Sequence, residues 1–332
     1  NIMIKYIKEM TIEDLKNLDE EIKIEMINRF VESDLKETLE ELSFDNYGKF
    51  ICKHCSSTNT KKAGFNSQGK QRFKCKDCNK HMSQTTGLVN FSSKKSFNHW
   101  VICFESVLAG DTLEITAFKA NISVRTAFRW RHKLLYVINT KLNKKVLSGV
   151  VTLDETMFPV VFKNKNNPND TITIKRGMSN QKINVTCAID SNKNTIIKVV
   201  DRGRVSAEGL IAAYESLIEE NSIVVSDSLR SYHRLMDRLN VRWMKIPSKK
   251  KSINEFTLDP INHVHASLKD FIYKYKGISI KYLQGYCALF DYVRYNKKFY
   301  EKEHLFDLIK DIFSIKCHIS CELLDSNSMI YL

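Results

Sequence analysis

Apolar residues recur at helical spacing in two parts of the chain and form short β-branched runs in a third. Residues 11–44 and 93–142 repeat apolar side chains every three or four positions, which predicts amphipathic helices. From residue 149 the pattern changes to short runs rich in Val and Ile, typical of strands. Further helical stretches fall at 207–220, 232–239, 261–276 and 279–300. This order of elements predicts an α/β domain with a mixed sheet.

Residues 112–120 and 123–135, joined by a short turn, predict a helix-turn-helix. Ser123 is a suitable N-cap for the second helix, and Asp111 can cap the first. The side chains expected on the N-terminal half of the second helix, the part that enters the major groove, are Arg125, Thr126 and Arg129. Helical hairpins are common, so the motif alone is weak evidence for DNA binding, and the basic cysteine-containing segment that precedes it provides the support.

Four cysteines precede these helices in two C-x₂-C pairs separated by nineteen residues: Cys52, Cys55, Cys75 and Cys78. Two such knuckles give tetrahedral S₄ coordination, which suits Zn²⁺. The alternative is a disulfide framework, which the lack of a secretory signal disfavours. We expect a zinc ribbon with a small core formed by Phe65, Phe73 and Phe91.

The net charge of +14 is unevenly distributed. Residues 1–50 hold 7 Lys/Arg and 13 Asp/Glu, a net of −6, whereas residues 51–150 hold 18 and 4, a net of +14. A block this basic favours binding to nucleic acid, because each phosphate contact releases counterions. The alternative is an ordinary solvated surface. No apolar run reaches the length that a bilayer requires, so we expect no membrane partner and a cytoplasmic protein.

Two aspartates follow buried apolar runs directly. Asp154 comes after Val150–Leu153, and Asp227 comes after Ile223–Ser226. An α/β sheet binds its ligands outside the ends of its strands, so we expect these carboxylates to converge there and to bind hard divalent cations. Taken singly, an aspartate at a strand end is more often a cap or a turn former.

At these residues the chain resembles insertion-sequence transposases that have an N-terminal zinc ribbon, a helix-turn-helix and an RNase H-like DDE domain. The matching stretches are Leu153–Thr156, Lys175–Gly177, Ala188–Asp190, Val225–Asp227, Ile261–Lys269 and Gly277–Asn296. The resemblance extends over about residues 46–300 and implies an RNase H-like fold with a mixed sheet.

The resemblance implies that Asp154 and Asp227 are the first two metal-binding acids and that Mg²⁺ or Mn²⁺ is the catalytic cation. His265 falls where most relatives have a third acid, and Lys269 matches the basic residue four positions later. Imidazole suits Mn²⁺ better than Mg²⁺. Asn262 shares the helix face with both residues and offers an alternative oxygen ligand.

The resemblance also implies the partners and the division of the chain. Double-stranded DNA would be bound as transposon ends and as target, by a homo-oligomer, and Lys175 and Arg176 would contact its backbone. The expected parts are an acidic helical arm (1–45), a zinc ribbon (46–91), a helix-turn-helix domain (92–148), an RNase H-like catalytic domain (149–302) and a C-terminal helical tail (303–332). We expect metal-dependent strand cleavage and strand transfer.

Two rival interpretations come from other functional classes. The first is a transposase-derived DNA-binding regulator without catalytic activity, and the second is a structure-guided nuclease that hydrolyses DNA but does not join it. Metal-dependent nicking separates the transposase from the regulator, and strand-transfer products separate it from the nuclease.

Overall fold

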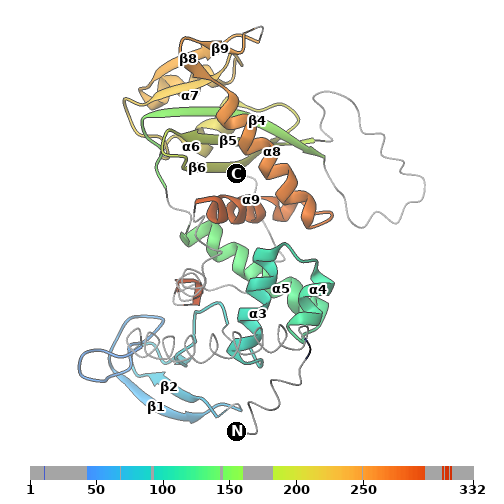
Figure 1. Cartoon of the computed structure of the whole chain (residues 1–332). Helices are drawn as coiled ribbons and strands as arrows, with labels where there is room; N and C mark the ends of the chain where they lie inside the picture. Colours follow the sequence, from blue (N-terminus) through green and yellow to red (C-terminus); the bar gives the residue numbers. More distant parts are fainter. Residues whose placement is uncertain are drawn as a thin grey trace. The chain divides into compact units, whose positions relative to one another are not determined.

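The structure is a computed structural model (Figure 1). It describes residues 11, 43–67, 69–90, 93–142, 145–159, 182–248, 250–295, 309, 311–313 and 315. The chain divides into two compact units, Asn1–Ile102 with Lys298–Ile319 and Cys103–Lys297 with Ser320–Leu332, and each is considered by itself. The arm and the tail expected from the sequence fall almost wholly outside the described residues, as do Lys175 and Arg176.

The first unit contains a small antiparallel sheet around the cysteine pairs. Its strands pair in chain order: β1 (Thr60–Phe65), β2 (Gln71–Cys75) and β3 (His81–Met82). The β1–β2 hairpin contains a bulge between Lys62 and Phe65. Gly64 within this bulge has a φ of +71°, a conformation that glycine adopts without strain.

Aromatic rings form the core of this small sheet. Phe50 and Phe73 stack with ring centroids 3.8 Å apart, and Phe44 packs edge-on against both. The buried members of the core are Phe50, Cys52, Phe73, Cys75 and Met82. The prediction that Phe65 belongs to this core is wrong, because Phe65 lies at the end of β1 and is 67% exposed. Phe91 lies outside the described residues.

Helices α4 (Leu113–Lys119) and α5 (Val124–Val137) lie where the sequence predicted a helix-turn-helix. They follow α3 (Phe97–Ala109), and α5 continues into the short π-helix η1 (Ile138–Leu142). Ser123 caps α5 by accepting a hydrogen bond of 3.2 Å from the Thr126 N–H. Thr112 rather than Asp111 caps α4, because Asp111 instead accepts hydrogen bonds from Ser106 and Lys119.

The second unit is built on a five-stranded sheet in the order β6-β5-β4-β7-β8. The strands are β4 (Val150–Pro159), β5 (Lys182–Asp190), β6 (Thr195–Arg202), β7 (Ile223–Asp227) and β8 (Arg242–Ile246). The first three are antiparallel, whereas β7 and β8 run parallel to β4. This is the strand order of RNase H-like domains, and it confirms the predicted α/β fold. The sequence did not predict β8, an edge strand in which only Ile246 is buried.

Helices cover both faces of this sheet. Buried residues of α6 (Ala207–Tyr214) and α7 (Tyr232–Leu239) pack with Leu153 of β4 and Ala188 of β5 in one apolar cluster. Side chains alternate between the faces of a strand, so Asp154 lies on the opposite face. There α8 (Asp259–Lys274) packs against β4 and β5, and α9 (Ile280–Tyr295) packs against β6 (Figure 1).

The remaining pieces are small. Strands β9 (Ser252–Ile253) and β10 (Phe256–Thr257) form a two-stranded hairpin directly before α8. Across the described ranges, no helix combines the length and the apolar character needed to cross a membrane.

Gly209 of α6 supplies a test of this packing. A Cβ at this position would lie 2.4 Å from Val200 Cγ1 and 2.6 Å from Asp201 Oδ2. We expect Gly209→Ala to lower the free energy of unfolding by about 1–3 kcal/mol through overpacking, measured by chemical denaturation. Ala212→Gly, on the exposed side of α6, is the control for helix propensity alone and should cost about 1 kcal/mol. Stabilisation by Gly209→Ala would contradict the close packing of α6 on β6.

Candidate active site and metal sites

Asp154 and Asp227 lie at the same level of two neighbouring strands. In the parallel pairing of β4 with β7, Thr152 lies opposite Val225, and each aspartate follows two residues later. Because neighbouring strands are about 4.8 Å apart, this register sets the two carboxyl groups side by side. The prediction that the first strand ends at Asp154 is wrong. β4 continues to Pro159 because it stays paired with β5 beyond the end of β7.

Helix α8 brings His265 to the same face of the sheet. The apolar stripe of α8 (Ile261, Val264, Leu268 and Ile272) is buried, and His265 beside it is only 8% exposed. Lys269, one turn later, is half-buried, whereas Asn262, one turn earlier, is exposed. The structure therefore brings His265 and Lys269 toward the sheet and leaves Asn262 exposed.

The charges at this site perturb one another. Burial raises the pKa of Asp154 to about 7, and the charges of Glu155 and Asp227 add to the effect. Burial lowers the pKa of His265 to about 4, and the charge of Lys269 lowers it further. A hydrogen bond with the Asp154 backbone opposes this shift. At neutral pH the His265 ring is therefore uncharged and has a lone pair to offer.

These groups fit a divalent cation. Nε2 of His265 is buried and has no hydrogen-bond partner among the described residues, and a cation would relieve the repulsion that raises the pKa of Asp154. The arrangement is not a closed cage. Within the described part of the chain, only the cysteine cluster brings three or more such ligand atoms within 4.8 Å of one another. A cation held by the aspartates would complete its shell with other oxygens, as Mg²⁺ usually does with water.

Glu155 is a third carboxylate at this site, and the sequence analysis did not assign it a role. It points to the face opposite Asp154, where the fully buried Tyr232 donates a hydrogen bond of 2.5 Å to Oε2. Burial raises the pKa of Glu155, the bond from Tyr232 opposes the shift, and the charge of Asp227 adds to it. The sequence places Glu155 next to Asp154, but it gives no sign that Tyr232, 77 residues later, is its hydrogen-bond partner.

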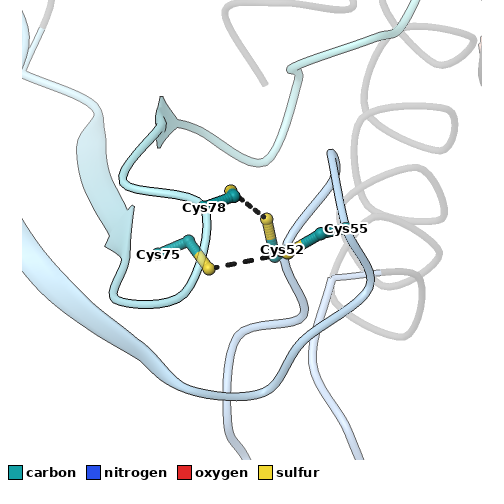
Figure 2. A group of neighbouring side chains, drawn as sticks. All are labelled: Cys52, Cys55, Cys75 and Cys78. Atoms are coloured by element: carbon teal, nitrogen blue, oxygen red, sulfur yellow. Dashed lines mark hydrogen bonds between the residues drawn. The ribbon is translucent and has the colours of Figure 1, made fainter.

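The four cysteines converge in the first unit, as Figure 2 shows. Their sulfurs all lie within 4.8 Å of one another, with Cys52 Sγ 3.6 Å from Cys78 Sγ and Cys55 Sγ 3.7 Å from Cys75 Sγ. Four thiols at this spacing could hold a zinc ion, whose sulfur ligands lie about 4 Å apart. The cluster draws one C-x₂-C pair from each side of the β1–β2 hairpin.

The two knuckles share a backbone design. Ser56 directly follows the first pair with a φ of +60°, and Asn79 directly follows the second with a φ of +61°. Asp77 links them, because its carboxylate accepts hydrogen bonds of 2.5 Å from Ser57 and 2.8 Å from Asn59. A backbone hydrogen bond from Cys78 is the main cause that lowers the pKa of Cys75 to about 7, which favours the thiolate that metal ions bind.

The comparisons with known proteins agree with this geometry. Residues 146–296, which contain the whole five-stranded sheet and α6 to α9, match the ISXO2-like transposase domain. This match covers a little under half of the chain. The resemblance inferred from the sequence motifs is therefore confirmed over residues 146–296, and the match supports DNA transposase function. The alternative of a regulator without catalytic activity is not favoured.

Two solved structures contain chains with some similarity to this one. The Mos1 strand transfer complex is 14% identical, with a TM-score of 0.26, over 63% of this chain and 73% of that chain. The simian T-cell lymphotropic virus intasome in complex with PP2A regulatory subunit B56 gamma is 10% identical, with a TM-score of 0.26, over 66% and 71%. No curated protein sequence matches the chain. The assignment of the transposase domain rests on the family match and on the strand order.

The helix that the sequence predicted to read DNA has accessible basic residues at its start. Arg125 is exposed, and Thr126 and Arg129 are half-buried. Arg131, one turn after Ala127, has a structural role instead. It is 2% exposed and donates hydrogen bonds to the Asp111 carbonyl oxygen at 2.7 Å and to Thr116 Oγ1 at 2.9 Å.

The raised pKa of Asp154 predicts how pH affects the metal-free transposase. Its folded-state value of about 7 lies above the ordinary value of 3.8, so the folded state binds the proton more tightly and loses stability as pH rises from about 4 to about 7. At pH 8, Asp154→Asn should therefore stabilise the protein by about 2–4 kcal/mol, and at pH 4 it should have little effect. Thermal and chemical unfolding at both pH values measure this.

Asp237→Asn, on the exposed face of α7, is the matched control and should change stability by less than about 0.5 kcal/mol at either pH. Mn²⁺ should stabilise the wild type at pH 8 but not Asp154→Asn. Equal stability of wild type and Asp154→Asn at pH 8 would show that the carboxylate of Asp154 is not destabilised by its surroundings.

Proposed function

We propose that this transposase is a DDE-type enzyme that binds the terminal inverted repeats of an insertion sequence and then cuts and joins DNA strands at Asp154, Asp227 and His265. The observation that carries the proposal is the register of β4 and β7. It sets two aspartates side by side under a helix that presents a neutral, buried histidine. The third position, an acid in most relatives, is here an imidazole.

Asp154 and Asp227 would hold Mg²⁺ or Mn²⁺ with His265 as the third ligand. Two such cations activate a water or a 3′-hydroxyl and stabilise the leaving oxygen during in-line displacement at phosphorus. Lys269, one turn after His265, would contact a phosphate at the cleaved position. Asn262 would serve as a ligand only if α8 turned, because its side chain is exposed.

DNA binding would be shared between the ribbon and the helix-turn-helix. Residues 51–150 carry a net charge of +14 (18 Lys/Arg against 4 Asp/Glu), which suits a polyanion. Arg125, Thr126 and Arg129 would reach base edges in the major groove, and Lys175 and Arg176 would contact the backbone. Two copies or more would assemble on paired transposon ends.

The domain boundaries would be those expected from the sequence: the acidic arm at 1–45, the zinc ribbon at 46–91, the helix-turn-helix domain at 92–148, the catalytic domain at 149–302 and the C-terminal tail at 303–332.

Zinc is the structural metal that this proposal requires. We expect one Zn²⁺ per chain, bound by Cys52, Cys55, Cys75 and Cys78. Cys52→Ser should lower the zinc content from about one ion per chain to near zero and abolish binding to transposon ends, because the ribbon core is too small to fold well alone. Zinc content by mass spectrometry and DNA binding by gel shift measure this.

Cys103→Ala is the control, since Cys103 is buried in α3 and is not a member of the cluster, and it should retain zinc. Retention of a full zinc complement by Cys52→Ser would contradict the proposed ligand set.

Activity on the DNA that flanks the gene tests the catalytic site. Asp154→Ala and Asp227→Ala should each reduce strand cleavage to background, because each removes charge that the cations require. His265→Glu should preserve activity with Mg²⁺ or raise it relative to Mn²⁺, since it supplies a hard oxygen ligand. His263→Ala, on an exposed position of the same helix, is the control.

Full cleavage by either aspartate variant would overturn the proposed site. DNA binding without metal-dependent nicking by the wild type would favour a regulator, and nicking without joined products would favour a nuclease.

A further inference from the structure

Hydrogen bonds, rather than apolar packing, join the described residues on either side of the β1–β2 hairpin turn. The connection from Asn66 to Lys70 is closed by three hydrogen bonds: Asn66 N–H to the Lys70 carbonyl oxygen at 2.9 Å, Gly69 N–H to the Asn66 carbonyl oxygen at 3.0 Å and Lys70 N–H to Asn66 Oδ1 at 2.9 Å. The Gln71 side-chain amide donates to the Gly64 carbonyl oxygen at 2.8 Å and so spans the bulge. The backbone is therefore hydrogen-bonded on both sides of Phe65.

Phe65 is exposed at this tip although the ribbon has an aromatic core. The rings of Phe44, Phe50 and Phe73 pack together, whereas Phe65 is 67% exposed and belongs to no part of that core. Burying a phenylalanine side chain stabilises a fold by about 1.5–3 kcal/mol, and the exposed Phe65 does not contribute this stabilisation. A single exposed apolar residue is ordinary on a protein surface, and Phe65 differs from that ordinary case in the charge of the residues around it.

That setting is uniformly basic. Between Thr60 and Lys76 the chain has no acid, and its cations are Lys61, Lys62, Lys70, Arg72, Lys74 and Lys76. In the strand register Lys61 lies directly opposite Lys74, an arrangement of like charges that destabilises a sheet. A hydrogen-bonded hairpin that tolerates this repulsion and exposes an aromatic ring is suited to a partner with closely spaced anions and flat apolar surfaces.

We propose that Phe65 is a wedge that inserts at a base step of duplex DNA while the hairpin lysines bind the flanking phosphates. This inference rests on the proposed function, in which the ribbon contacts transposon ends, and adds a base-stacking element to it. Apolar side chains that enter a base step unstack and kink the duplex, most readily at flexible pyrimidine–purine steps. The hairpin would then contribute sequence preference through DNA deformability, in addition to the charge that sets affinity.

The test uses the full-length protein and duplexes of its own flanking DNA that carry 2-aminopurine, one position at a time. Wild-type protein should increase the fluorescence at one or two adjacent positions, because insertion unstacks the bases there. Phe65→Ala should remove this increase and weaken binding about tenfold without changing the salt dependence, since stacking involves no counterion release. Phe65→Trp should retain both properties.

Two controls separate the wedge from simpler explanations. Tyr47→Ala removes an aromatic ring that is 89% exposed in a turn outside the hairpin, and it should leave binding and fluorescence unchanged. The double variant Lys61→Ala with Lys62→Ala should reduce the slope of log affinity against log salt by about one to two while leaving the 2-aminopurine signal of saturated complexes in place. Unchanged zinc content and melting temperature in Phe65→Ala would show that the variant folds.

The failures of the two proposals are distinguishable. If wild-type protein does not bind its flanking DNA, the proposed function fails. If it binds and Phe65→Ala binds equally well with the same fluorescence, the wedge alone is wrong. Phe65-dependent binding to vesicles containing phosphatidylserine, with no effect of Phe65→Ala on DNA, would assign the surface to a membrane and overturn the inference.

Discussion

Parallel hydrogen bonding between β4 and β7 places Asp154 and Asp227 at the same level of two neighbouring strands, and the proposed catalytic site depends on this register. β4 remains paired with β5 on its other side and so extends past β7, which keeps Asp154 on a rigid strand at the point where the sheet narrows. Burial is the main cause of the raised pKa of Asp154, and repulsion by the carboxylates of Glu155 and Asp227 adds to it. Ionised Asp154 therefore destabilises the metal-free protein, and a bound cation would offset this by neutralising the charge.

The helix-turn-helix and the catalytic sheet belong to one compact unit, and a few buried polar contacts connect them. Arg131 of α5 donates to the Asp111 carbonyl oxygen and lies over the Tyr275 ring, 5.5 Å from its centroid. The Tyr275 hydroxyl, at the end of α8, donates to the Val107 carbonyl oxygen at 2.8 Å. The helix that carries His265 is thus joined at its C-terminal end to the helices that would read DNA. DNA held by α5 would therefore have a defined position relative to α8.

Local patterns were sufficient to predict much of this structure. The cysteine spacing predicted the sulfur cluster, Ser123 predicted the start of α5, and apolar runs predicted the two strands that carry the aspartates. The features that were missed depend on contacts between distant residues. β8 is an edge strand in which apolar and polar residues do not alternate clearly. The hydrogen bond between Glu155 and Tyr232 joins β4 to α7. Phe65 follows a bulge in the β1–β2 hairpin and lies outside the ribbon core. Sequence periodicity alone does not report such contacts.

The central claim is that a divalent cation replaces a proton on Asp154, and calorimetry tests it most directly. Mn²⁺ is titrated into zinc-loaded protein at pH 7 in buffers of different ionisation enthalpy, which gives the number of protons released per bound ion. With the pKa of Asp154 at about 7 and His265 already uncharged, we expect release of about half a proton at pH 7 and almost none at pH 9. Asp154→Asn should release none. Mn²⁺ binding to the wild type without proton release at pH 7, or with equal release from Asp154→Asn, would contradict the account.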